Sequence, residues 1–205
     1  EELGELARSA AAVGFQVAIH AIGDRGVRVA LDALRGARKG PLPHRVEHAQ
    51  IVATTDFKRF REQGVTASMQ PSHATSDMDW AETRVGPERV AGSYAFRRMK
   101  ESGANLVFGS DFPVESPDPL KGIYAAVARA DEQGNPRGGW RSEQRLSVEE
   151  ALHALSTEAS RVVGEDETLA DFTVFDRDLR KLEPREILEA RVLRVVVGGR
   201  EVYRR

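Results

Sequence analysis

The stretch Phe15-Gln16-Val17-Ala18-Ile19 is followed by His20 and then by Ala21-Ile22-Gly23-Asp24, and this succession indicates the fold class. The first five residues are mostly apolar and follow a glycine, which predicts a short strand. Asp24 then stands where a helix over residues 24–34 would begin, and the apolar residues of that segment repeat at helical spacing. A strand that leads into a helix within a few residues is the repeating unit of α/β folds.

The same unit recurs along the chain up to about Ala128. The further strands are predicted over residues 44–49, 65–69 and 104–108. The further helices are predicted over residues 54–63, 93–102 and 120–129. The segment 71–87 is polar and irregular, and we predict a long loop there. Strands that alternate with helices in this way predict a parallel sheet with helical crossovers.

The C-terminal part of the chain has a different character. Ser147 and Glu150 are spaced as a capping box for a helix that runs to Leu155, and a second short helix is predicted over residues 157–163. The strands predicted beyond them cover residues 172–175, 192–197 and 201–203. Gly198-Gly199 separates the last two strands and is a hairpin signal. A small β element is therefore expected after the α/β part.

The composition excludes several classes of protein. The chain has 205 residues, 30 of them basic and 32 acidic, and its net charge of −2 offers no electrostatic case for a nucleic-acid partner. It contains no run of about 18 apolar residues, so no membrane span is predicted. Because no charged-then-apolar leader opens the chain, we expect a cytoplasmic protein. Because cysteine is absent, any metal has to be held by histidine and carboxylate.

Side chains that can bind a metal follow each of the four predicted parallel strands. His20 follows the first strand, and His48 ends the second. His73 comes just after the third strand, and Asp111 follows the fourth. The carboxyl ends of parallel strands meet at one edge, where the sites of α/β proteins form, so two histidines and one aspartate there could bind a divalent ion. The plainer alternatives are hydrogen-bonded structural histidines and an aspartate that organises a turn.

Two other histidines and one glycine-containing stretch give weaker signals. His44 begins the strand predicted over residues 44–49 and so lies at the opposite edge of the sheet, and His153 lies within a predicted helix, so both are expected to be structural or exposed. Gly23-Asp24-Arg25-Gly26 at a helix start could bind an anion, which would suit a phosphate-binding α/β barrel. That alternative predicts no metal and leaves His48 and Asp111 without roles.

Four motifs stand in order along the chain: His20-Ala21-Ile22-Gly23-Asp24, Arg45-Val46-Glu47-His48-Ala49-Gln50, Gln70-Pro71-Ser72-His73 and Gly109-Ser110-Asp111-Phe112-Pro113. As an ordered set they resemble the later barrel motifs of the amidohydrolase superfamily. The resemblance is closest to its amidohydrolase-3 branch, which includes enzymes similar to N-substituted formamide deformylase. It runs from about Val13 to the C-terminus, and it is specific as a set although no single motif is.

The resemblance implies a (β/α)8 TIM-type barrel with a small β-sandwich. Residues 1–165 would form the second half of the barrel, with strands 5–8, and residues 166–205 would supply C-terminal strands of the sandwich. The family's first two metal ligands form a His-x-His pair on strand 1, and no such pair occurs in this sequence. We therefore expect the C-terminal half of a longer enzyme, whose partner is its own N-terminal half or, in a homodimer, a second copy.

The resemblance also implies roles for the site residues. His20, His48 and Asp111 would be metal ligands, and Asp111 would also take a proton from the attacking water. His73 would face the substrate. The implied reaction is hydrolysis of a carbon–nitrogen, amide-like bond in a small molecule by water activated on one or two divalent ions, with zinc expected. The isolated chain is expected to be inactive, and the alternative is a non-catalytic half-barrel or pseudoenzyme that lacks the N-terminal ligands.

Overall fold

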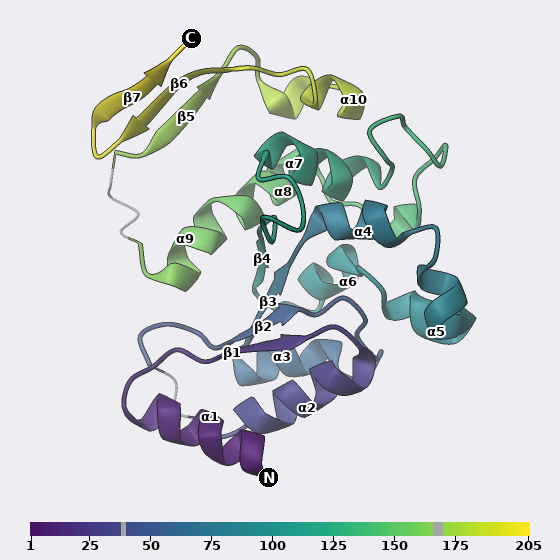
Figure 1. The fold of residues 1–205 in the computed structure, drawn as a ribbon, viewed down its shortest axis with the longest axis vertical. Coiled ribbons are helices and arrows are strands. Elements are labelled where there is room, and N and C mark those ends of the chain that lie inside the picture. The colour runs from purple at the N-terminus through teal and green to yellow at the C-terminus, as the bar shows by residue number, and fades with distance from the viewer. Residues whose placement is uncertain (38–39, 166–169) are drawn as a thin grey trace.

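The computed structural model describes residues 1–37, 40–165 and 170–205, and a parallel four-stranded sheet lies at its centre (Figure 1). The strands lie in the order β1-β2-β3-β4, so each strand pairs with the next one along the chain. Their bounds are β1 Ala18–Ala21, β2 Arg45–His48, β3 Thr66–Met69 and β4 Leu106–Phe108. All four predicted strands are confirmed, with bounds that differ from the predicted ones by at most three residues.

Helices connect these strands and continue after the last of them. The earlier helices are α1 Glu2–Ala12, α2 Asp24–Leu34, α3 Phe57–Gln63, α4 Pro71–Asp77, α5 Ala81–Arg89 and α6 Phe96–Glu101. The later helices are α7 Pro119–Ala128, α8 Val148–Leu155, α9 Thr157–Val163 and α10 Pro184–Ile187. The predicted alternation of strand and helix is confirmed. In the part of the chain that the structure describes, every helix is too short or too polar to cross a membrane.

The prediction of a loop over residues 71–87 is wrong, because this segment contains α4 and most of α5. Pro71 occupies the first turn of α4, where its fixed φ favours the helix and its missing N–H costs nothing. In α5, Gly86 has a φ of 79° and interrupts the helical conformation just before Pro87. Both helices are short and polar, so the apolar periodicity that revealed the other helices missed them.

The strand register divides the parallel sheet into an apolar and a polar face. One row of paired residues is apolar and consists of Ile19, Val46, Ala67 and Leu106; the last three belong to the hydrophobic core, and Ile19 is partly buried against it. The next row is polar in three of its four places and consists of His20, Glu47, Ser68 and Val107. Helix α2 packs on β1 and β2, α3 packs on β3, and α6, α8 and α9 pack on β4. The helices therefore cover the apolar face, and the row that contains His20 lies on the other.

A three-stranded antiparallel sheet follows near the C-terminus (Figure 1). Its strands are β5 Phe172–Phe175, β6 Val192–Val197 and β7 Arg200–Arg204, in the order β5-β6-β7. Gly198 and Gly199 have φ values of 56° and 74°, as the favoured two-residue hairpin turn requires. The predicted strands and hairpin are confirmed. The domain boundary predicted after residue 165 adjoins residues 166–169, which lie outside the described residues, and it stays a prediction.

The capping box predicted for α8 is confirmed and is extended by an ion pair. The Ser147 hydroxyl accepts the Glu150 backbone N–H, and Glu150 Oε2 accepts the Ser147 backbone N–H. Both carboxylate oxygens also accept hydrogen bonds from Arg97 of α6, at 2.9 and 2.6 Å. These bonds, above all those from Arg97, lower the pKa of Glu150 to about 2.

We expect this pair to make the stability depend on pH between about 4.5 and about 2. Because the folded-state pKa lies below the unfolded one, the contribution of the carboxylate is complete above about pH 4.5 and is lost as the pH falls through about 2. The measurement is the free energy of unfolding against pH for the natural sequence, Glu150→Gln and Arg97→Met. The advantage of the natural sequence over either variant should shrink in this window, and an advantage that stays constant down to pH 2 contradicts the assignment.

Candidate metal centre

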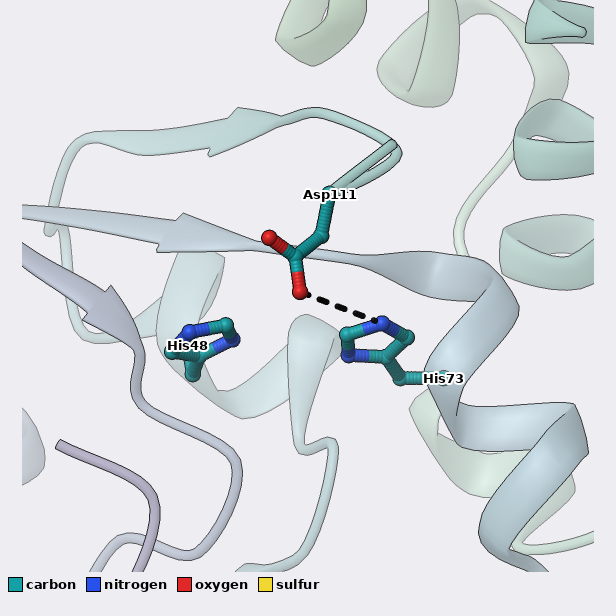
Figure 2. Close-up of side chains that lie close together, drawn as sticks. All are labelled: His48, His73 and Asp111. Atoms are coloured by element: carbon teal, nitrogen blue, oxygen red, sulfur yellow. Dashed lines mark ion pairs between the residues drawn. The ribbon is translucent and has the colours of Figure 1, made fainter. Parts of the chain in front are cut away.

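Three of the four residues singled out from the sequence meet at the carboxyl ends of the strands (Figure 2). His48 is the last residue of β2, His73 lies in the first turn of α4 directly after β3, and Asp111 lies three residues after β4. One donor atom from each lies within 4.8 Å of the other two. Figure 2 shows the carboxylate of Asp111 directed toward the space between the two rings, with one oxygen 3.7 Å from His73 Nε2. Two imidazoles and one carboxylate therefore face one small volume.

The backbone bends at this edge of the sheet. His48 has a φ of 72° and Asp111 a φ of 59°, in the left-handed region that non-glycine residues rarely occupy. Regular alternation along β2 would turn His48 away from the face that holds Glu47 and His20. The ring of His48 instead lies 4.5 Å from the ring of His20, between centroids. A backbone conformation of this kind destabilises the folded state by about 1–3 kcal/mol per residue and is typical of functional sites.

His73 carries a buried nitrogen that finds no hydrogen-bond partner among the described residues. The residue is 8% exposed, and the unpaired atom is Nε2. The Asp111 oxygen at 3.7 Å is too distant for a hydrogen bond. A buried polar atom left unpaired costs about 1–3 kcal/mol, so the site favours a ligand that would satisfy this nitrogen. Nitrogen and oxygen donors in this combination suit a divalent ion such as zinc, and the residues present fit the metal that the resemblance implies.

His20 lies beside this group but outside it. Its ring packs edge-on against that of His48, with an interplanar angle of 72°, whereas the rings of His48 and His73 stack with centroids 6.0 Å apart. The structure thus brings His73, which the resemblance assigns to the substrate, into the group of donors with His48 and Asp111. His20, an expected ligand, lies outside the group, and its ring packs against the ring of His48. Which three side chains hold the ion stays a prediction.

Gln70 is a site residue that the sequence analysis missed. It directly precedes α4, it is buried, and its Oε1 lies 3.0 Å from His48 Nδ1. A histidine that binds a metal commonly hydrogen-bonds through its other ring nitrogen to such a group. The available signal was the position of Gln70 after the third strand and three residues before His73. A glutamine at that position does not by itself identify the side chain that it contacts.

A buried tyrosine joins the segments that carry His48 and His73. The Tyr94 hydroxyl accepts a hydrogen bond from Gln50 Nε2 at 2.5 Å and donates one to the Asp77 carboxylate. Gln50 lies two residues after His48, and Asp77 is the last residue of α4. Burial, and then the hydrogen bond to Asp77, raise the pKa of Tyr94, so the phenol stays protonated.

Tyr94→Phe is expected to lower the free energy of unfolding by about 1–3 kcal/mol. The ring would still fill its place in the core, whereas the Gln50 amide and the Asp77 carboxylate would each lose a partner. Chemical denaturation measures the change. Tyr203→Phe is the matched control, because Tyr203 is exposed on β7 and its loss should change little. Equal stability of Tyr94→Phe and the natural sequence would show that the phenol does not join the two segments.

A cavity of about 360 Å³ adjoins the segments that carry His73 and Asp111. It is bounded by α4, by α7 and by the loops that follow Asp111 and α7. Residues on its walls include Ser72, Thr75, Glu115 and Tyr124. This volume is at the lower end of the range of small-molecule sites. His48, His73 and Asp111 are not among the residues that line it, so the cavity lies next to their segments and not at the donor atoms themselves.

The remaining candidates from the sequence have other surroundings. His44 is buried, and its Nδ1 accepts the backbone N–H of Val17 at 3.1 Å, whereas His153 is exposed on α8. Helix α2 begins at Asp24, as predicted, and Gly23 rather than Asp24 is its N-cap. Asp24 instead places a negative charge in the first turn of the helix, which disfavours an anion there.

Comparison with known proteins identifies relatives over almost the whole chain. Residues 1–203 match the model of the amidohydrolase family. Putative amidohydrolase YtcJ of Bacillus subtilis (strain 168) is 29% identical over 214 residues, which cover 99% of this chain and 40% of that protein. N-substituted formamide deformylase of Arthrobacter pascens is 26% identical over 219 residues, which cover 100% of this chain and 39% of that protein. The chain thus spans about two fifths of the length of these curated relatives.

Solved structures are similar in fold. An uncharacterised metal-dependent hydrolase from Pyrococcus horikoshii superposes with a TM-score of 0.69 at 36% identity, over 78% of this chain and 32% of that one. Atrazine chlorohydrolase TrzN from Arthrobacter aurescens, solved in complex with zinc, superposes with a TM-score of 0.64 over 98% of this chain and 47% of that one. At 17% identity this second likeness concerns the fold alone. The match of the family model agrees with the resemblance of the four ordered motifs, and the chain belongs to the amidohydrolase family.

Proposed function

We propose that the protein containing these residues is a metal-dependent hydrolase that cleaves carbon–nitrogen, amide-like bonds in small molecules. The observation that carries this proposal is the group formed by His48, His73 and Asp111, whose donor atoms lie within 4.8 Å of one another. The buried, unpaired Nε2 of His73 supports a further ligand at this point. The family and the formamide deformylase relative support the type of bond, and the Pyrococcus hydrolase supports metal dependence.

In this proposal His20, His48 and Asp111 hold the ion, and the nitrogen and oxygen donors favour zinc. A bound divalent ion polarises the carbonyl under attack and makes water nucleophilic near neutral pH. Asp111 accepts the proton of the attacking water at a carboxylate oxygen and returns it to the leaving nitrogen. His73, 3.7 Å from that carboxylate, faces the substrate and donates to the carbonyl oxygen as it gains negative charge.

The proposed architecture is the second half of a (β/α)8 barrel over residues 1–165, with C-terminal strands of a β-sandwich over residues 166–205. Four parallel strands in sequence order, with helices on one face, support it. Within the described residues β1 and β4 each pair with a single neighbour, so both have a free edge. We propose that the N-terminal half of the same protein supplies the missing strands. The coverage of about two fifths of the relatives supports this, and a second copy is the alternative.

The test is the metal content and the amidase activity of the complete protein. We expect bound zinc, hydrolysis of members of a panel of N-substituted formamides and cyclic amides, loss of activity on chelation and recovery when zinc returns. A complete protein that holds no divalent ion would overturn the proposal and favour the pseudoenzyme. Bound zinc without hydrolysis of any amide would overturn the proposed reaction while leaving the metal site in place.

Two histidine variants separate the roles of ligand and substrate contact. His20→Asn is expected to lower the zinc content, because it removes a ligand. His73→Asn is expected to keep the zinc and to lower turnover by about 10²–10³-fold, the usual loss for a donor to the developing oxyanion. Elemental analysis and steady-state kinetics measure the two effects, with the exposed His153→Asn as the control. Loss of zinc in His73→Asn but not in His20→Asn would mean that His73 is the ligand and that His20 contacts the substrate.

A further inference from the structure

We propose that Gln70 is a positioning residue that sets the tautomer and the orientation of His48, so that Nε2 of His48 is the nitrogen left free for the ion. The inference rests on the proposed function and deepens it, because it names the group that prepares one ligand. The observation behind it is the contact of 3.0 Å between Gln70 Oε1 and His48 Nδ1. Gln70 is 6% exposed, so water competes little for this bond.

The second contact of Gln70 determines which way its amide faces. Gln70 Nε2 lies 3.5 Å from the backbone carbonyl oxygen of Ser68. A carbonyl oxygen only accepts hydrogen bonds, so the amide nitrogen faces Ser68 and the amide oxygen faces His48. Because the amide oxygen is also only an acceptor, Nδ1 of His48 must donate to it. The neutral ring of His48 therefore carries its proton on Nδ1 and its lone pair on Nε2.

The position of Gln70 in the chain links the two histidines of the donor group. Gln70 directly precedes α4, and His73 lies three residues later, so the bond fixes the ring of His48 relative to the helix that carries His73. The two rings are nearly parallel, with an interplanar angle of 12°. Loss of a hydrogen-bond partner behind a metal-binding histidine typically costs about 10–100-fold in metal affinity or activity. Gln70 is therefore expected to affect metal binding although it is not itself a ligand.

His44 provides an internal control for the tautomer. Its Nδ1 accepts the backbone N–H of Val17 at 3.1 Å, so the neutral ring of His44 must carry its proton on Nε2. His44 and His48 are thus expected to be opposite tautomers in the same molecule. Nitrogen chemical shifts distinguish a protonated ring nitrogen from an unprotonated one, so a single spectrum reports both residues.

The experiment uses the complete, metal-free protein with 15N-labelled histidine, at a pH about 2 units above the ordinary histidine pKa of about 6.5. Signals are assigned by their absence from His44→Gln and His48→Gln. We expect His48 to show a protonated Nδ1 and His44 a protonated Nε2. A protonated Nε2 on His48 of the natural protein overturns the role of Gln70 without recourse to any variant.

Variants then test whether Gln70 is the cause. Gln70→Met removes the acceptor, and we expect His48 to lose its single tautomer while the His44 signals stay unchanged. The zinc dissociation constant should rise by about 10–100-fold. Gln70→Glu keeps an acceptor at the same place and should retain the Nδ1-protonated ring. Gln144→Met removes a glutamine that is buried to a similar extent, 7% exposed, and should change neither quantity.

The outcomes separate this inference from the proposed function. A natural protein that binds no zinc overturns the proposed function, and the tautomer of His48 still tests Gln70. A Gln70→Met protein in which His48 keeps a protonated Nδ1 and zinc binds with unchanged affinity overturns the inference while the hydrolase stands. If Gln70→Met alters the His44 signals, its fold has changed, and the natural protein and Gln70→Glu decide the question.

Discussion

Asp111→Asn is expected to lower the turnover of the complete protein by about 10²–10⁴-fold, the range for loss of a general base. The amide keeps the shape of the carboxylate but neither carries its charge nor accepts the proton of water. The fold should survive, because asparagine adopts the left-handed conformation that Asp111 has, with φ of 59°, more readily than most residues. The measurements are kcat and kcat/KM for an amide substrate, the zinc content and the midpoint of unfolding.

The control for this substitution is Asp79→Asn. Asp79 is exposed in the turn after α4, outside the donor group, so removal of its charge should leave turnover unchanged. An Asp111→Asn protein with unchanged turnover would show that another group takes the proton. A metal-free Asp111→Asn protein whose midpoint of unfolding falls below that of the metal-free natural protein would mean that Asp111 acts through the structure of the turn, the plainer alternative raised by the sequence.

The second large effect is expected when the 205 residues are produced alone. The free edges of β1 and β4 can pair with other strands, and unpaired edges promote association. Five large apolar side chains in the segments before β1 and after β4 are at least 67% exposed, namely Leu6, Val13, Phe15, Phe112 and Val114. Leaving apolar surface in water forfeits about 25 cal/mol for each Å². We therefore expect self-association or poor solubility, weak zinc binding and no turnover.

Sedimentation velocity and zinc titration measure these properties. Co-expression with the proposed N-terminal half is the control, and it should restore a discrete particle, tight zinc binding and activity. A soluble monomer of the 205 residues that melts cooperatively would show that the proposed half-barrel architecture is wrong. Stoichiometric tight zinc together with turnover in that monomer would show that the N-terminal half is dispensable for the chemistry.

Several parts of the fold could be predicted from the sequence because their signals are local. The capping box of Ser147 and Glu150, the hairpin at Gly198-Gly199 and the apolar strands each depend on residues within a few positions of one another. Where such signals were weak, prediction failed. The polar segment 71–87 is largely helical, because Pro71 starts a helix that apolar spacing did not reveal.

The candidate site was predictable only in part. The rule that parallel strands present their carboxyl ends at one edge was enough to select His20, His48, His73 and Asp111. It could not show that the donor atoms of His73, His48 and Asp111 lie within 4.8 Å of one another. Nor could it show that His20 lies outside this group, with its ring packed against that of His48. Differences of a few ångströms in the distances between side chains depend on the packing of α4 and on side-chain conformations. Neither can be predicted from the spacing of residues in the sequence.

By itself, then, the sequence determined the order of the strands and of the helices with apolar periodicity, the edge of the sheet at which polar residues gather and the family, because each of these depends on local pattern or on ordered motifs. Only the tertiary structure decided the direction of His48, since a φ of 72° overrides the alternation of its strand. Only the tertiary structure also placed Gln70 against His48. These two residues lie 22 positions apart on neighbouring strand ends, and their contact exists only once β2 and β3 have paired in register.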